Sequence, residues 1–236
     1  MYEFSSRVRY SEIGKDGKLA LGAILNYFQD CTTFHSEKVG YGFHHLAQQN
    51  KAWVLLSWQI VVERYPEFGE TIKVATKAYD FKRSFGYRNF MMYDEQGVCV
   101  AYANSVWLYM DTKKMRPVRV DAKQAEDYQL EEKLPMEYAD MKIQIPEEMA
   151  VSLPSYVVQN YQIDTNGHMN NGQYLNMAYA AVDEDIQVKQ MRAEYKKSAM
   201  AGELIQPVVY KEENRYVITL NSENNEIFAV IEFLLS

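Results

Sequence analysis

One short stretch of the sequence gathers side chains that suit acid–base chemistry. It places Asp164, Asn166 and His168 at positions i, i+2 and i+4. An imidazole can act as a general base near neutral pH, and a carboxylate can orient it. An amide can hold a water molecule or donate to a developing negative charge. If the stretch is extended, the three side chains project to one side, an arrangement that suits attack of water on a carbonyl group.

The stretch lies directly before a predicted helix, residues 171–181. Backbone N–H groups at a helix start, aided by the helix dipole, can stabilise an oxyanion. A plainer interpretation stands beside this one. An Asp-x-Asn-Gly sequence is a common turn, and Asn170 or Asn171 can simply cap the helix.

An internal repeat bears on this choice. When the chain is displaced by 150 positions, one region matches itself, with a strand, a Gly-containing turn and an apolar-periodic helix in each copy. The matched residues are Val8, Ile13, Gly17, Gly22, Leu25 and Asn26 with Val158, Ile163, Gly167, Gly172, Leu175 and Asn176. The copies differ where chemistry is expected, because Gly14 and Lys18 stand in place of Asp164 and His168. The repeat therefore favours a catalytic role for the second copy.

Hydrophobic periodicity predicts the elements that position this stretch. The first half contains a helix at 19–39 and strands at 53–63, 71–79, 85–93 and 99–109. The second half contains a strand at 156–162, the helix at 171–181, and strands at 189–197, 204–212, 215–221 and 226–234. A long helix before a meander of antiparallel strands is typical of the hotdog fold. We therefore predict an α+β tandem (double) hotdog, with an N-terminal hotdog at 1–120, a linker at 121–153 and a C-terminal hotdog at 154–236.

Composition narrows the class of protein. A net charge of −7 argues against a nucleic-acid binder, which needs a broad basic face. No window approaches the ~20 apolar residues of a membrane span, and the N-terminal residues lack the apolar stretch of a secretory signal. Cys31 and Cys99 are too few for a disulfide framework. We expect a cytoplasmic protein without a membrane or nucleic-acid partner.

Three histidines outside the stretch raise the question of a metal site. His35 lies on the first predicted helix, and His44 and His45 follow Gly42. Two adjacent histidines do not easily point at one ion. We therefore expect surface or core histidines, no metal, and cysteines that act as small core residues.

The stretch and several motifs of the first half resemble one known family. Asp164, Asn166, His168, Asn170 and Asn171 match the Asp-x-Asn-x-His-x-Asn-Asn motif of acyl-ACP thioesterases, the double-hotdog enzymes of plant plastids and many bacteria. The first half is similar too, at Trp53-Val54, at Val62-Glu63-Arg64-Tyr65-Pro66 with Gly69, and at Ser105-Val106-Trp107. The resemblance covers nearly the whole chain.

The resemblance implies hydrolysis of the thioester between a fatty acyl chain and the phosphopantetheine arm of acyl-carrier protein (ACP), without a cofactor. It implies an acyl pocket in the N-terminal hotdog and catalysis by Asp164, Asn166 and His168 in the C-terminal one. A double hotdog joins in one chain what single-hotdog proteins form by dimerising, so we expect a monomer or a homodimer.

The sequence departs from the family pattern at two positions. Ser198 stands where the family carries a catalytic Glu, and Ala199 where plant members carry Cys. Ser198 can hold a water molecule but cannot be a carboxylate base. Either Asp164 and His168 suffice, which we favour, or Glu194 or Glu203 substitutes, or activity is weak.

Two other functions stay open. One is an acyl-CoA thioesterase of the same fold, and the other is a catalytically weak acyl-binding protein. Because ACP is strongly acidic, a chain of net charge −7 needs a local basic patch to dock it. Three clusters qualify: Lys82-Arg83 with Arg88, Lys113-Lys114 with Arg116 and Arg119, and Lys196-Lys197.

Overall fold

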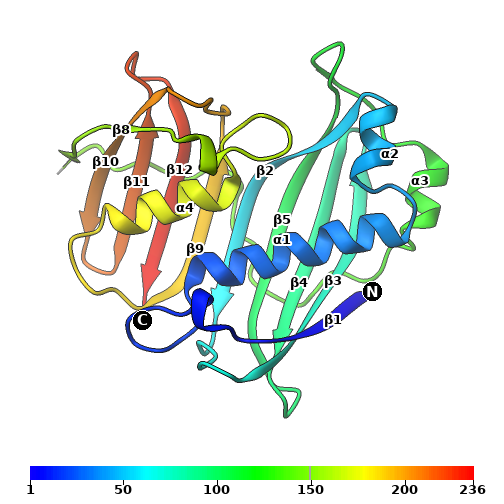
Figure 1. Ribbon diagram of the computed structural model, residues 1–236, viewed down its shortest axis with the longest axis horizontal. Coiled ribbons are helices and arrows are strands. Elements are labelled where there is room, and N and C mark those ends of the chain that lie inside the picture. The colour runs from blue at the N-terminus through cyan, green and yellow to red at the C-terminus, as the bar shows by residue number, and fades with distance from the viewer. Residues whose placement is uncertain (149) are drawn as a thin grey trace. The chain divides into compact units, whose positions relative to one another are not determined.

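The computed structural model describes residues 1–148 and 150–236, and the chain forms two compact units. Residues 1–56 and 60–139 belong to the first unit, and residues 57–59 and 140–236 to the second. In each unit a helix lies along an antiparallel sheet (Figure 1). The predicted linker, residues 121–153, is shared between the two units, and its role as a linker stays a prediction.

The first unit has the strand order β1-β3-β4-β5-β2, with β6 paired to β5. Helix α1 buries Ile24, Leu25, Phe28 and Cys31 at helical spacing. The elements are β1 (Tyr2–Arg7), η1 (Tyr10–Glu12), α1 (Leu21–Lys38), α2 (Phe43–Gln48), β2 (Lys51–Val62), β3 (Thr71–Lys82), β4 (Phe85–Tyr93), β5 (Cys99–Asp111), β6 (Arg116–Pro117) and α3 (Ala122–Asp127).

The second unit has the strand order β9-β12-β11-β10-β7, with β8 paired to β10. Helix α4 buries Tyr174, Leu175 and Ala178, and its exposed Tyr179 packs edge-on against Phe233 of β12, with ring centroids 5.8 Å apart. The elements are β7 (Ala150–Ser152), β8 (Tyr156–Val157), η2 (Asn160–Gln162), α4 (Asn171–Ala180), β9 (Val188–Tyr195), β10 (Leu204–Glu212), β11 (Arg215–Asn221) and β12 (Ile227–Leu235).

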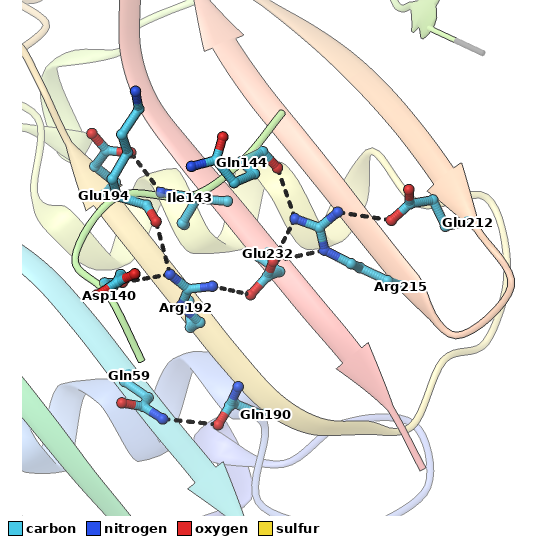
Figure 2. Close-up of polar contacts among 11 residues, drawn as sticks. Gln59, Asp140, Ile143, Gln144, Gln190, Arg192, Glu194, Glu212, Arg215 and Glu232 are labelled. Carbon is cyan, nitrogen blue, oxygen red and sulfur yellow. Dashed lines mark hydrogen bonds and ion pairs between the residues drawn. The ribbon is translucent and has the colours of Figure 1, made fainter. Parts of the chain in front are cut away.

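A polar network covers the sheet face of the second unit that α4 does not cover (Figure 2). Glu232 is buried, accepting hydrogen bonds from Arg192 Nη1 at 2.9 Å and Arg215 Nε at 2.7 Å. The two guanidinium groups also donate to backbone carbonyls of residues 140–144, which cross this face as a strap. Ile143 of the strap packs into a small apolar cluster with Val217 and Val230.

Most predicted elements are confirmed close to their expected ends, but one strand is wrong. Residues 156–162 were expected to be extended throughout, whereas the strand stops at Val157 and η2 follows. The reason is a capping box, in which the side chains of Gln159 and Gln162 bond each other's backbone N–H groups and curl the chain. Helix α2 was not predicted, because six residues are too few to show a helical period. Among the described residues, no helix is both long and apolar enough to cross a membrane.

Candidate functional site

The predicted catalytic stretch forms a closed turn. The backbone N–H of Asp164 donates to the carbonyl of His168 at 2.8 Å, and the N–H of Gly167 donates to the carbonyl of Asp164 at 3.1 Å. Gly167 has a φ of +80°, a conformation that glycine adopts without steric cost. The stretch is therefore a turn and not the extended chain that was considered as a way to align the three side chains.

The carboxylate of Asp164 shapes this turn from inside. Its Oδ1 accepts from the backbone N–H of Asn166 at 2.8 Å and from that of His168 at 3.4 Å. These are the bonds of an Asx-turn. Over residues 1–148 and 150–236, the side chains of Asn166 and His168 have no hydrogen-bond partner of their own. Asp164 thus holds the backbone of both residues, and their polar groups remain available for a ligand.

The helix that follows the turn is capped by Asn170. Its Oδ1 accepts from the N–H of Gly172 at 2.9 Å, which confirms the capping role considered from the sequence. The cap removes one of the backbone donors expected for an oxyanion. In the described part of the chain, the N–H of Asn171 is left without a partner at this helix start. The donors that the site offers are this N–H group and the side chains of Asn166 and His168.

Ser198 precedes Ala199, and Ala199 forms hydrogen bonds to the end of the turn and to helix α4. The carbonyl of Ala199 accepts from the N–H of Met169 at 2.8 Å, and the N–H of Ala199 donates to the Tyr174 hydroxyl at 2.8 Å. Ala199 therefore contacts the residue that follows His168, and Ser198 is its neighbour in the sequence on the β9 side. Ser198 is exposed, and within the described residues its side chain forms no hydrogen bond with the predicted partners.

Glu194 cannot replace the missing carboxylate, because it faces the wrong side of β9. Its Oε2 accepts from the N–H of Ile143 at 3.0 Å in the strap, and its Oε1 lies 3.4 Å from Lys196 Nζ (Figure 2). The next residue, Tyr195, points to the helix side and donates to the carbonyl of Asn171 at 3.1 Å. The strand alternation therefore directs Glu194 away from the turn.

Glu203 has a structural task of its own. Its Oε2 accepts from the N–H of Met200 at 2.7 Å and closes a turn around Gly202. The first unit builds the same turn without any catalytic motif, since Glu70 Oε2 accepts from the N–H of Glu67 at 2.9 Å. The role of Glu203 that the structure shows is therefore to stabilise this turn.

The two copies of the repeat share their backbone hydrogen bonds, so the repeat seen in the sequence is also present in the structure. Gly14 N–H donates to the Lys18 carbonyl at 2.8 Å, as Asp164 does to His168, and Leu19 N–H donates to the Pro66 carbonyl at 2.7 Å, as Met169 does to Ala199. The scaffold is the same, and Asp164, Asn166 and His168 of the second copy replace Gly14, Asp16 and Lys18 of the first.

Tyr174 was missed by reasoning from the sequence. It is buried, and burial raises the pKa of its phenol to about 12, so the hydroxyl stays neutral. In the repeat it falls on Ile24, while Ala199 takes the place of Pro66. The sequence did contain a signal, because the two copies differ at both positions together. Where the first copy has proline, which has no N–H to donate, it also lacks the tyrosine hydroxyl that would accept.

The remaining polar candidates lie in the first unit. His35 is buried with its Nδ1 2.5 Å from Arg88 Nη2, and His44 and His45 are exposed on α2. Arg88 is itself buried, so its place in a surface cluster with Lys82 and Arg83 was wrong. In the part of the chain that the structure describes, no group of three or more His, Cys, Asp or Glu residues is arranged to hold a metal ion.

Comparison with known proteins identifies the family. Residues 1–128 match the acyl-ACP thioesterase N-terminal domain, and residues 147–233 match the acyl-ACP thioesterase C-terminal domain. The chain belongs to the acyl-ACP thioesterase family.

Individual relatives are more distant. The chain is 26% identical over 180 residues to a chloroplastic acyl-(acyl-carrier-protein) hydrolase of Cuphea viscosissima, covering 71% of this chain and 44% of that one. It is 24% identical over 215 residues to the chloroplastic palmitoyl-acyl carrier protein thioesterase of Arabidopsis thaliana, covering 84% and 52%. The chain thus spans about half the length of these curated relatives.

Solved structures establish the fold. An acyl-ACP thioesterase from Bacteroides thetaiotaomicron superposes with a TM-score of 0.90 at 21% identity, covering 99% of this chain and 97% of that chain. The 12:0-ACP thioesterase from Umbellularia californica superposes with a TM-score of 0.87 at 16% identity, covering 100% and 96%. The predicted α+β tandem hotdog is confirmed.

Proposed function

We propose that this chain hydrolyses the thioester of fatty acyl-ACP to free fatty acid and ACP. Family membership supports the reaction class. The observation that carries the assignment to one site is the difference between the two copies of the repeat. The same hydrogen-bonded turn presents Asp164, Asn166 and His168 in the second unit, and Gly14, Asp16 and Lys18 in the first.

In the proposed reaction, water attacks the thioester carbonyl while His168 accepts its proton. The water oxygen forms a bond to the carbonyl carbon, the carbon–sulfur bond then breaks, and the proton passes from the imidazole to the departing thiolate. The side-chain amide of Asn166 and the N–H of Asn171 donate to the carbonyl oxygen as it gains negative charge. Asp164 keeps the turn in the shape that this reaction needs.

Ser198 has a lesser part in this proposal. The bonds of Ala199 hold it beside the turn, where its hydroxyl can position the attacking water. A serine hydroxyl is not a base at neutral pH, so proton transfer rests on His168. Since Glu194 faces the other side of the sheet, Asp164 and His168 work without a further carboxylate from β9.

The test is release of free fatty acid from a panel of acyl-ACP chain lengths by wild type, His168→Ala and Lys18→Ala. General acid–base catalysis contributes ~10²–10⁴-fold, so His168→Ala should lower kcat at least ~100-fold. Lys18→Ala changes the equivalent position of the first turn and should leave kcat unchanged. Full turnover by His168→Ala would disprove the assignment.

The same assay separates the two other functions considered from the sequence. An acyl-CoA thioesterase would turn over acyl-CoA at least as efficiently as acyl-ACP at equal concentration. A catalytically weak acyl-binding protein would bind acyl chains saturably and release no acid.

A further inference from the structure

The structure distinguishes between the three basic clusters of the sequence. Lys82 Nζ lies 3.1 Å from Asp80 and Arg88 is buried, whereas Arg83 is exposed and has no ion-pair partner in the part of the chain that the structure describes. Lys196 is paired with Glu194 and Lys197 with Glu226, so the third cluster is neutralised. The second cluster differs. Over residues 1–148 and 150–236, its members have no ion-pair partner, and all are exposed: Lys113, Lys114, Arg116 and Arg119.

The fold of the first unit gathers these cations at one end of its sheet. Strand β6 pairs with the end of β5, with Arg116 opposite Asp111, and the loop between them projects beyond the sheet. The β3–β4 turn lies at the same end, since Tyr109 N–H donates to the Ser84 carbonyl at 2.7 Å. Val120 N–H donates to the Arg83 carbonyl at 2.9 Å, which adds Arg83 to the group. We call Arg83, Lys113, Lys114, Arg116 and Arg119 the basic patch.

The acidic residue within this segment does not neutralise the patch. Residues 111–119 contain four basic residues and one acidic residue, Asp111, a net charge of +3 on a chain whose net charge is −7. Asp111 is buried beneath the loop, with Oδ2 2.7 Å from Lys51 Nζ and Oδ1 accepting from the backbone N–H groups of Lys113 and Lys114. The bond from Lys51 leads the effects that lower its pKa to about 2. The carboxylate of Asp111 is therefore engaged by Lys51 and by the backbone of the loop, and it does not pair with the exposed cationic side chains.

A further backbone hydrogen bond and a tight turn define the shape of the loop. Thr112 N–H donates to the Asn50 carbonyl at 2.9 Å, and Met115 turns the chain with a φ of +49°. Met115 is 74% exposed at the tip, between the cationic side chains. Unpaired like charges on one loop repel one another, a cost that an anionic partner relieves.

We propose that the basic patch is the surface on which the acidic carrier protein docks to deliver the acyl group. This inference rests on the proposed function. The patch is positively charged although the net charge of the whole chain is negative. Such a local positive surface can steer an acidic protein to one place on an otherwise acidic molecule. A membrane surface fits less well, because the patch consists of turns with one large apolar side chain, Met115, within residues 111–119.

The test compares two triple variants with equal loss of charge. The patch variant is Lys113→Gln, Lys114→Gln and Arg116→Gln, and the control variant is Arg7→Gln, Lys142→Gln and Lys189→Gln, which are also exposed. Exposed charge pairs contribute modestly one by one, so three together should raise KM for acyl-ACP about tenfold at low salt, with kcat unchanged. The increase should shrink as salt rises. The control variant should behave as wild type.

Two further measurements separate this proposal from the proposed function. The first is KM for acyl-CoA, which should not change in the patch variant. If KM for acyl-CoA rose as much as KM for acyl-ACP, the patch would bind a phosphate group common to both substrates, and the docking proposal would be overturned. The second is direct binding of ACP carrying its phosphopantetheine arm, measured by calorimetry, which does not require hydrolysis. Binding weakened in the patch variant supports the dock even if no thioester is cleaved. Hydrolysis and binding that both stay at wild-type levels in the patch variant overturn the dock and leave the proposed function standing.

Discussion

The hydroxyl of Tyr174 accepts a hydrogen bond from the backbone N–H of Ala199 at 2.8 Å. The carbonyl of Ala199 in turn accepts from Met169 in the turn that carries His168. One peptide segment thus joins helix α4, the end of β9 and the candidate catalytic turn. In the first unit Ile24 and Pro66 occupy the equivalent positions, so the bond is particular to the second unit.

Tyr174→Phe should destabilise the protein by about 1–3 kcal/mol, because it leaves the buried N–H of Ala199 without a partner. Chemical denaturation measures this loss. Adding Ala199→Pro should recover part of it, since proline has no N–H and the first unit tolerates Pro66 at this position. Purely additive losses in the double variant would contradict the pairing. Tyr10→Phe, at an 80% exposed tyrosine, is the control.

Asp164→Asn should preserve the turn, whereas Asp164→Ala should not, because an amide oxygen still accepts from the N–H groups of Asn166 and His168. We expect Asp164→Asn to keep most of kcat and Asp164→Ala to lose stability by about 1 kcal/mol together with activity. Thermal unfolding and acyl-ACP hydrolysis check both variants. Equal loss of kcat in the two, with Asp164→Asn as stable as wild type, would show instead that the negative charge itself acts on His168.

Glu232→Gln should lower the free energy of unfolding by about 3 kcal/mol, because it leaves the guanidinium groups of Arg192 and Arg215 without their shared carboxylate. The network lies on the sheet face away from α4 (Figure 2), so kcat measured well below the unfolding temperature should not change. Glu213→Gln, an exposed residue next to this region, should have no effect on either quantity. A variant as stable as wild type would show that the strap at residues 140–144 is held by its apolar contacts instead.

Stability should fall as the pH is lowered from about 6.5 to 3, and His35 should contribute to this fall. Burial, and then the charge of Arg88, lowers the pKa of His35 from 6.5 to about 3. In this window the unfolded chain binds a proton that the folded protein does not, so stability is lost as pH falls, by up to ~1.4 kcal/mol per pH unit. His35→Gln keeps an acceptor for Arg88 and should flatten this dependence in denaturation curves. His44→Gln, on the surface, should leave it as in wild type, and a profile unchanged by His35→Gln would contradict the assignment.

The sequence by itself determined the elements and the location of the candidate site. Helix periodicity placed α1 and α4, and β-branched and aromatic runs bounded by turn residues placed β4, β10 and β11 at their observed ends. The repeat located the turn of Asp164, because each copy is a short continuous segment that can be compared directly with the other. These features depend on local conformational preferences, which a short window of sequence contains.

Only the tertiary structure decided which polar groups are free to act. Glu194 and Tyr195 are neighbours in the sequence, and alternation alone does not say which of them faces α4. Arg88 belongs to a basic cluster in the sequence but is buried, whereas Lys113 and Lys114 have no ion-pair partner among the described residues, since the nearby Asp111 is bound by the distant Lys51. Tyr174 acquires its role from a residue 25 positions away. Burial and hydrogen-bond pairing depend on residues far apart in the chain, so they are settled only when the sheets and helices pack together.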